Sequence, residues 1–111
     1  MRTLLTIVFT LGCAMAASAG QDAAQVTKGQ QVYTKQKCQL CHAVAGKGGK
    51  SSPLDGVGTK LTAEEIREWI TNPTQASAKA KSTKKPPMPA KYGSLAAADL
   101  DALVAYMQSL K

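Results

Sequence analysis

The sequence predicts a single all-α domain, on three observations. Apolar side chains recur every three or four residues in separate segments, as they do on the buried face of a helix. No segment shows the strict alternation of a half-buried strand, and glycine and proline gather between the helical segments, where the chain must turn. The 111 residues leave room for one small domain.

The start of the chain has the features of a secretory signal peptide. Arg2 gives a basic start, residues 4–15 are almost wholly apolar, and residues 17–19 form a small-x-small cleavage site. A bilayer-spanning helix needs roughly 20 apolar residues, so this stretch is too short to be an anchor. We therefore expect a cleaved leader at 1–19 and an exported domain at 20–111 without a transmembrane anchor. Lipid attachment at Cys13 is an alternative, although the residues before it fit a lipoprotein signal poorly.

Three helices are expected in the exported domain. Residues 22–36 place their apolar side chains on one face. A second helix starts at the capping box of Thr62 and Glu65 and must end near Pro73, because the residue before a proline disfavours helix. The last helix covers residues 97–109, with a 3-4 spaced apolar stripe.

Two connections are expected to lack regular structure. Residues 45–58 are rich in glycine, lysine and serine and are typical of a loop. Residues 74–87 carry no large apolar side chain and are expected to form an exposed, mobile, basic loop.

The chemistry of the chain is concentrated in a C-x-x-C-H motif at residues 38–42. This is a haem-attachment signature, since two cysteines at this spacing can add to the two vinyl groups of one haem edge. The next residue, His42, can then bind the iron axially. Export agrees with covalent haem attachment. The domain also has few aromatic side chains, which predicts that something else fills its interior.

Three other uses of the motif are possible. A thioredoxin-like dithiol needs a βαβ pattern around the cysteines, and none is visible. A structural zinc site needs four ligands, and Cys38, Cys41 and His42 exhaust the cysteines and histidines of the exported domain. A disulfide between the two cysteines closes too short a loop to stabilise the fold by much. Haem attachment is the interpretation we favour.

A sixth iron ligand is found by elimination, because His42 is the sole histidine of the sequence. The exported domain has two methionines. Met107 lies on the apolar stripe of the last helix, which favours core packing. Met88 lies between prolines, which hold the backbone extended and leave it no helical face to pack on. Met88 is therefore the expected ligand; alternatives are that it fills an apolar gap while the iron is five-coordinate or bound by a lysine.

The order of the motifs resembles that of small bacterial class I cytochromes c over residues 26–111. The resemblance rests on the C-x-x-C-H motif, then Pro-Leu-Asp-Gly-Val-Gly at 53–58, Trp-Ile-Thr-Asn-Pro at 69–73 and Pro-Met-Pro at 87–89. It implies a cytochrome c-like fold of three to four helices around one covalently bound haem c, with the first and last helices crossing. The long basic segment at 74–87 departs from the family pattern, as does Ala96, where a capping Ser or Thr is common.

The resemblance also implies residue roles. Cys38 and Cys41 would hold the thioethers, with His42 and Met88 as axial ligands. The carbonyl of Pro53 would accept a hydrogen bond from the outer ring nitrogen of His42. The indole of Trp69 would donate to a haem propionate or else pack in the core. The first and last helices would cross where Gly29 and Tyr33 meet Leu103 and Tyr106.

Two filled axial positions predict a one-electron carrier, not an enzyme. With the expected leader, we predict a periplasmic, monomeric carrier between respiratory redox partners. Cleavage of the leader removes Arg2 and leaves a net charge of +6, one below the +7 of the whole chain. Lysines on either side of Met88 and of the motif predict a partner with an acidic docking surface. The alternative is a solvated basic loop that keeps the protein soluble. Nucleic acid is not expected as a partner, because no aromatic-basic platform is present. Alternatives are a haem sensor or peroxidase-like protein with a weak sixth ligand, and a dedicated subunit of a dehydrogenase or oxidase.

Overall fold

The computed structural model describes residues 22–111, so the expected leader at 1–19, its cleavage site and Cys13 lie outside the described residues. The elements of this part follow in the order α1 (Ala23–Lys35), η1 (Cys38–Leu40), β1 (His42–Val44), β2 (Lys47–Gly48), β3 (Ser52–Pro53), α2 (Val57–Lys60), α3 (Ala63–Thr71), α4 (Pro73–Ala80), η2 (Ala90–Ser94) and α5 (Ala97–Ser109). Most of them are helical, which confirms the predicted fold class. In residues 22–111, no helix has the length and apolarity needed to cross a bilayer.

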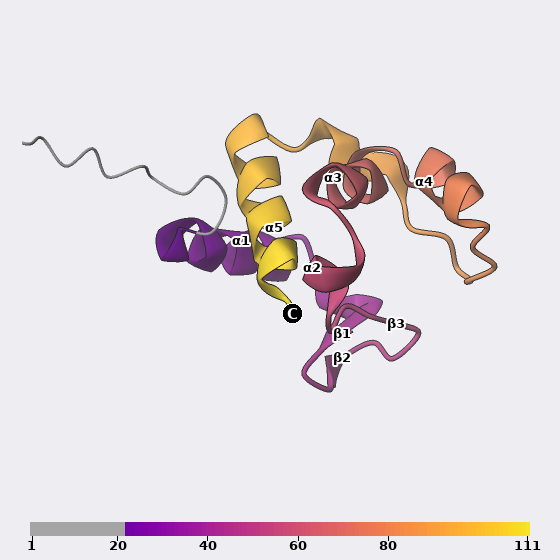
Figure 1. Cartoon of the computed structure of the whole chain (residues 1–111), viewed down its shortest axis with the longest axis horizontal. Coiled ribbons are helices and arrows are strands. Elements are labelled where there is room, and N and C mark those ends of the chain that lie inside the picture. The colour runs from indigo at the N-terminus through magenta and orange to yellow at the C-terminus, as the bar shows by residue number, and fades with distance from the viewer. Residues whose placement is uncertain (1–21) are drawn as a thin grey trace, which may run out of the picture.

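Helices α1 and α5 pack across each other, as expected (Figure 1). Gly29 lies at the crossing, where a Cβ atom would overlap the carbonyl oxygen of Ala102 and approach the Cβ of Tyr106 to 2.6 Å. One turn further along α1, the rings of Tyr33 and Tyr106 meet edge to face, with centroids 5.5 Å apart and planes at 68°. The missing side chain at Gly29 therefore allows the two backbones to approach closely.

The apolar core forms where α5 meets α1 and α3. Ile66 and Ile70 of α3 are buried there against α5. Met107 is buried in the same cluster, with 6% of its surface exposed, which confirms its expected role in core packing. Of the two methionines in residues 22–111, Met107 is therefore part of the buried core, and Met88 lies outside the apolar stripe of the last helix.

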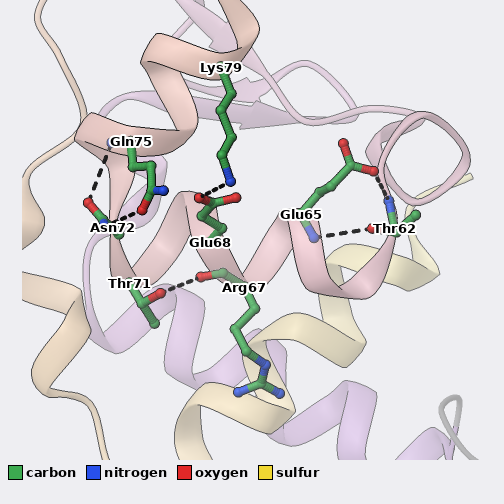
Figure 2. A network of polar contacts seen from close by, with 8 residues as sticks. All are labelled: Thr62, Glu65, Arg67, Glu68, Thr71, Asn72, Gln75 and Lys79. Carbon is green, nitrogen blue, oxygen red and sulfur yellow. Dashed lines mark hydrogen bonds and ion pairs between the residues drawn. The ribbon is translucent and has the colours of Figure 1, made fainter.

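The start of α3 shows the predicted capping box (Figure 2). Thr62 Oγ1 accepts a hydrogen bond from the backbone N–H of Glu65 at 3.2 Å, and Glu65 Oε1 accepts one from the backbone N–H of Thr62 at 3.1 Å. The helix ends at Thr71, one residue before the Asn72-Pro73 pair, as predicted. Both boundaries are therefore encoded by local chemistry.

The prediction of an irregular loop over 74–87 is wrong for its first half, because α4 occupies Pro73–Ala80. Asn72 ends α3 and also caps α4, with its side-chain oxygen accepting from the backbone N–H of Gln75 at 3.4 Å (Figure 2). Pro73 suits the first helical position, and it is buried together with Ala76. Lys79 of α4 also forms an ion pair with Glu68 of α3 at 2.8 Å. Because small residues are sufficient for packing between α4 and α3, the sequence of α4 has no large apolar stripe from which the helix could be predicted.

A small sheet occupies part of the expected loop at 45–58. Its strand order is β2-β1-β3, with β2 antiparallel and β3 parallel to β1. The parallel pairing places His42 beside Ser52. Gly48 is needed in β2 because its φ is +115° and a Cβ there would overlap the carbonyl oxygen of His42. Strands of two or three residues are too short to show alternation, which is why the sequence did not predict them.

Candidate functional site

The C-x-x-C-H motif begins directly after a sharp turn at the end of α1. Lys37 adopts the left-handed conformation, with φ of 58°, and the chain then continues into η1. Both Cys38 and Cys41 are free thiols, the first half-buried and the second exposed. The alternative of a disulfide between them is therefore not what the structure shows.

The Cys38 thiol lacks the lowered pKa of a redox-active cysteine. Burial is the main cause that raises the pKa of the Cys38 thiol above its ordinary value. Reactive cysteines of thioredoxin-like proteins have a lowered pKa instead, because the thiolate is the attacking species. Cys38 is thus held as a neutral thiol beside the apolar core, against which it packs.

Of the two residues between the cysteines, the apolar one is exposed and the polar one is partly buried. Leu40 is 72% exposed, while the side-chain oxygen of Gln39 is buried and has no hydrogen-bond partner in the described structure. The backbone of Gln39 is fixed, since its carbonyl accepts from the N–H of Gly49 at 2.8 Å. An apolar side chain is therefore presented on the surface between the two thiols.

The ring of His42 is fixed by the neighbouring strand. Its Nδ1 lies 2.8 Å from the carbonyl oxygen of Ser52. A carbonyl can only accept, so Nδ1 carries a hydrogen; in the neutral ring Nε2 then has the lone pair, which is the form that binds a metal. The backbone of the same residue is held from the other side, because the Tyr33 hydroxyl donates to the His42 carbonyl at 3.2 Å.

The expected partner of the His42 ring was the carbonyl of Pro53, and the structure corrects this by one residue. The parallel register pairs His42 with Ser52, so the Ser52 carbonyl reaches the ring. Pro53 itself is exposed and pairs with Ala43. The effect expected of the Pro53 carbonyl, fixing the orientation of the His42 ring, is therefore supplied by Ser52.

Met88 occupies a different environment from the buried Met107. It is half-buried and packs against the edge of the apolar core, as Cys38 does, while residues 81–87 before it are exposed. Its thioether is thus near the core surface and outside any helix. Packing against the core is also what the alternative role of an apolar filler predicts, so the expected role of Met88 as an iron ligand stays a prediction.

The structure also shows the surroundings of Trp69 and of two lysines near Met88. The Trp69 side chain is half-buried, lies outside the apolar core, and makes no hydrogen bond in the described structure. Its predicted bond to a propionate stays a prediction. The Lys91 ammonium lies 5.2 Å from the centroid of the Tyr92 ring, and Lys84 Nζ donates to the Ser51 carbonyl at 3.0 Å.

The donor set fits a haem and does not fit zinc. In the described residues, no three His, Cys, Asp or Glu side chains are grouped closely enough to hold a metal ion. The available donors are one imidazole with a fixed tautomer, one thioether and two free thiols, which suit haem attachment and axial ligation. Partly buried apolar side chains also surround the core, and an apolar ring could cover them; they include Val44, Leu54, Val57, Leu61 and Leu95.

Sequence reasoning missed the two serines that support the motif. The Ser52 carbonyl holds His42, and the Ser51 hydroxyl donates to the Cys41 carbonyl at 3.3 Å. Their backbone and hydroxyl groups carry no sequence signal of this role, because it depends on the strand register.

Comparison with known proteins gives one match. The family model for cytochrome c matches residues 26–111. Searches of curated proteins and of solved structures gave no match.

Proposed function

The chain belongs to the cytochrome c family of haem-based electron carriers, and we propose that it is a periplasmic, monohaem one-electron carrier. Members of the family hold haem c covalently. The observation that carries the proposal is the fixed His42 ring, whose Nδ1–Ser52 contact leaves Nε2 free beside two unpaired thiols.

The roles of the residues follow from their chemistry. Each thiol of Cys38 and Cys41 would add across a vinyl group, forming one C–S bond while the thiol hydrogen goes to the other vinyl carbon. His42 Nε2 and the Met88 thioether would be the protein's ligands to the haem iron. When bound, the haem supplies a one-electron Fe(III)/Fe(II) couple. The chain holds the ligands, and its apolar core disfavours the extra charge of the ferric site.

Filled axial positions support a carrier in preference to a catalyst. A peroxidase-like protein or a haem sensor needs an open or easily opened position on the iron. Met88 would close that position, and its contact with the core edge keeps the thioether close to the domain. The choice between these functions therefore depends on whether Met88 binds the iron.

The charge distribution supports a redox partner with an acidic docking surface. All the lysines around the motif and Met88 are exposed; they are Lys35, Lys37, Lys47, Lys50, Lys79, Lys81, Lys84, Lys85 and Lys91. Leu40 offers an apolar contact among them. Electron-transfer rates with such a partner should fall as salt rises, since the Debye length is about 10 Å at 0.1 M.

The deciding experiment is optical spectroscopy of the exported protein made with a haem-attachment system. We expect a c-type pyridine haemochrome and, in the ferric protein, the charge-transfer band of a thioether–iron bond. Met88→Ala should lose that band, bind external ligands and have a lower reduction potential, whereas the core variant Met107→Leu should keep the band. A low-spin Met88→Ala protein with an unchanged band would show that Met88 is not the ligand. A high-spin or CO-binding wild-type protein would favour the sensor or peroxidase.

A dedicated subunit of a dehydrogenase or oxidase would give the same spectra. Fixed-ratio co-purification with one enzyme from native membranes would identify it, and purification as a separate monomer would support a free carrier.

A further inference from the structure

One hydrogen bond joins the segment that carries Met88 to Ser51, the residue before strand β3, whose Ser52 carbonyl holds the His42 ring. Lys84 Nζ donates to the carbonyl oxygen of Ser51 at 3.0 Å, across 33 residues of sequence. The remaining hydrogen bonds of residues 81–89 in the described structure are local, such as the bond from the N–H of Lys84 to the hydroxyl of Ser82. In the described structure, the hydrogen bond of the Lys84 ammonium is therefore what links residues 81–89 to residues 50–53 through polar groups.

The Ser51 end of this bond is rigidly connected to the haem-attachment motif. The Ser51 hydroxyl donates to the Cys41 carbonyl, and the next residue accepts from the His42 ring at 2.8 Å. Strand pairing places Ser52 beside His42, and the N–H of Leu54 donates to the Ala43 carbonyl at 2.9 Å. A group that binds Ser51 is thus held in a fixed relation to His42.

The other end of the bond is connected to Met88 through a stiff segment. Lys84 precedes Met88 by four residues, and prolines stand at positions 86, 87 and 89. Each proline fixes its own φ near −65° and restricts the residue before it. Few backbone torsions between Lys84 and Met88 are free to change, so a constraint on the first limits the movement of the second.

We propose that Lys84 is a positioning residue, whose bond to Ser51 straps the Met88 segment to the chain directly before β3 and slows the exchange of Met88 for other iron ligands. The inference rests on the proposed function, in which His42 and Met88 would be the ligands of the haem iron. The strap joins the segment that carries Met88 to the residue next to Ser52, whose carbonyl holds the His42 ring. Loss of the strap would let the Met88 segment move away from the site more often.

The neighbouring lysines do not share this role. Lys85 makes no hydrogen bond or ion pair in the described structure, and Lys79 is paired with Glu68 within the α3–α4 contact (Figure 2). Lys81 ends α4 in the left-handed conformation. Lys85 therefore gives a matched control, because its replacement changes the net charge by the same amount and leaves the strap intact.

The test uses the full haem-loaded protein and measures how fast imidazole displaces Met88 from ferric iron. At saturating imidazole the rate is set by opening of the Met88 segment. Lys84→Ala should raise this rate about fivefold, the scale expected for loss of one exposed, charge-assisted hydrogen bond. Lys85→Ala should leave the rate within a factor of about 1.5, since no contact is lost. Lys84→Arg should restore most of the wild-type rate, because it keeps a charged donor.

A second measurement is independent of ligand chemistry. Amide hydrogen exchange over residues 82–91 should be faster in Lys84→Ala than in Lys85→Ala. Equal imidazole rates and equal exchange in these two variants would overturn the strap while leaving the carrier function in place. Absence of the thioether band in the wild-type protein would overturn the ligand assignment and the strap together. If Lys84→Ala fails to retain haem, Lys84→Gln, whose side chain is one atom shorter, replaces it in both measurements.

Discussion

Replacing Gly29 by alanine tests whether the close approach of α1 and α5 determines the stability of the domain. The new methyl group would overlap the carbonyl oxygen of Ala102, a backbone atom that cannot change rotamer, and would lie 2.6 Å from the Tyr106 Cβ. The helices must therefore separate by roughly an ångström, because protein interiors have no spare volume at such contacts.

The magnitude follows from three contributions. Overpacking of this kind costs about 1–3 kcal/mol, and a backbone clash belongs near the upper end. Separation of the helices also weakens the Tyr33–Tyr106 ring contact, and aromatic pairs contribute about 0.5–1.5 kcal/mol. The better helix propensity of alanine offsets part of this loss, by about 1 kcal/mol in the free energy of unfolding. We expect a net loss of about 2 kcal/mol in the free energy of unfolding, within these ranges.

Urea unfolding of the haem-loaded protein, followed by far-UV circular dichroism, measures this loss. The matched control is Gln31→Ala, an exposed position of the same helix, which should stay within about 0.5 kcal/mol of wild type. If Gly29→Ala were as stable as wild type, or more stable by its propensity gain, the close helix crossing would not be a stabilising constraint and the reasoning above would be refuted.

Two further predictions concern α4 and Tyr33. Asn72→Ala should lower the free energy of unfolding by about 1 kcal/mol through loss of the cap, with faster amide exchange confined to Pro73–Ala80; uniform loss of protection would argue against a local role. Burial raises the pKa of Tyr33 to about 12 from an ordinary 10.0. Between those pH values the folded protein keeps the Tyr33 proton and the unfolded chain releases it, so the free energy of unfolding falls as the pH rises. The stability of wild type relative to Tyr33→Phe should therefore decline from pH 10 to 12, and a flat difference would contradict the assigned burial effect.

The parts of the fold that were predicted correctly depend on local signals. The last helix was expected at residues 97–109 and is found at Ala97–Ser109, because its apolar stripe has a clear helical period. The capping box at Thr62 was read from two side chains whose roles are local. Helix α4 was missed because Pro73 and Ala76 are small enough to pack on α3 without a large apolar stripe.

The parts of the site that were not predicted depend on register. Cys38, Cys41 and His42 are identified by their spacing alone, but the carbonyl that holds His42 is chosen by the strand pairing of residues 42 and 52. Backbone carbonyls are alike in every residue, so no sequence pattern distinguishes Ser52 from Pro53. The same holds for the carbonyl of Ser51, whose contact with Lys84 forms only when distant segments meet.

The contact between α1 and α5 has a consequence for the order of events during folding. Helix α1, the first of the described fold, packs on α5, the last helix of that fold, so these two distant segments must meet before the fold closes. Contacts between segments so distant in sequence form late and slowly. Until then the Cys38 thiol, half-buried in the closed fold, is not yet packed against the core, while the Cys41 thiol stays exposed even after the fold has closed. On the proposed function, both thiols would thus be open to haem attachment in the interval before the domain closes.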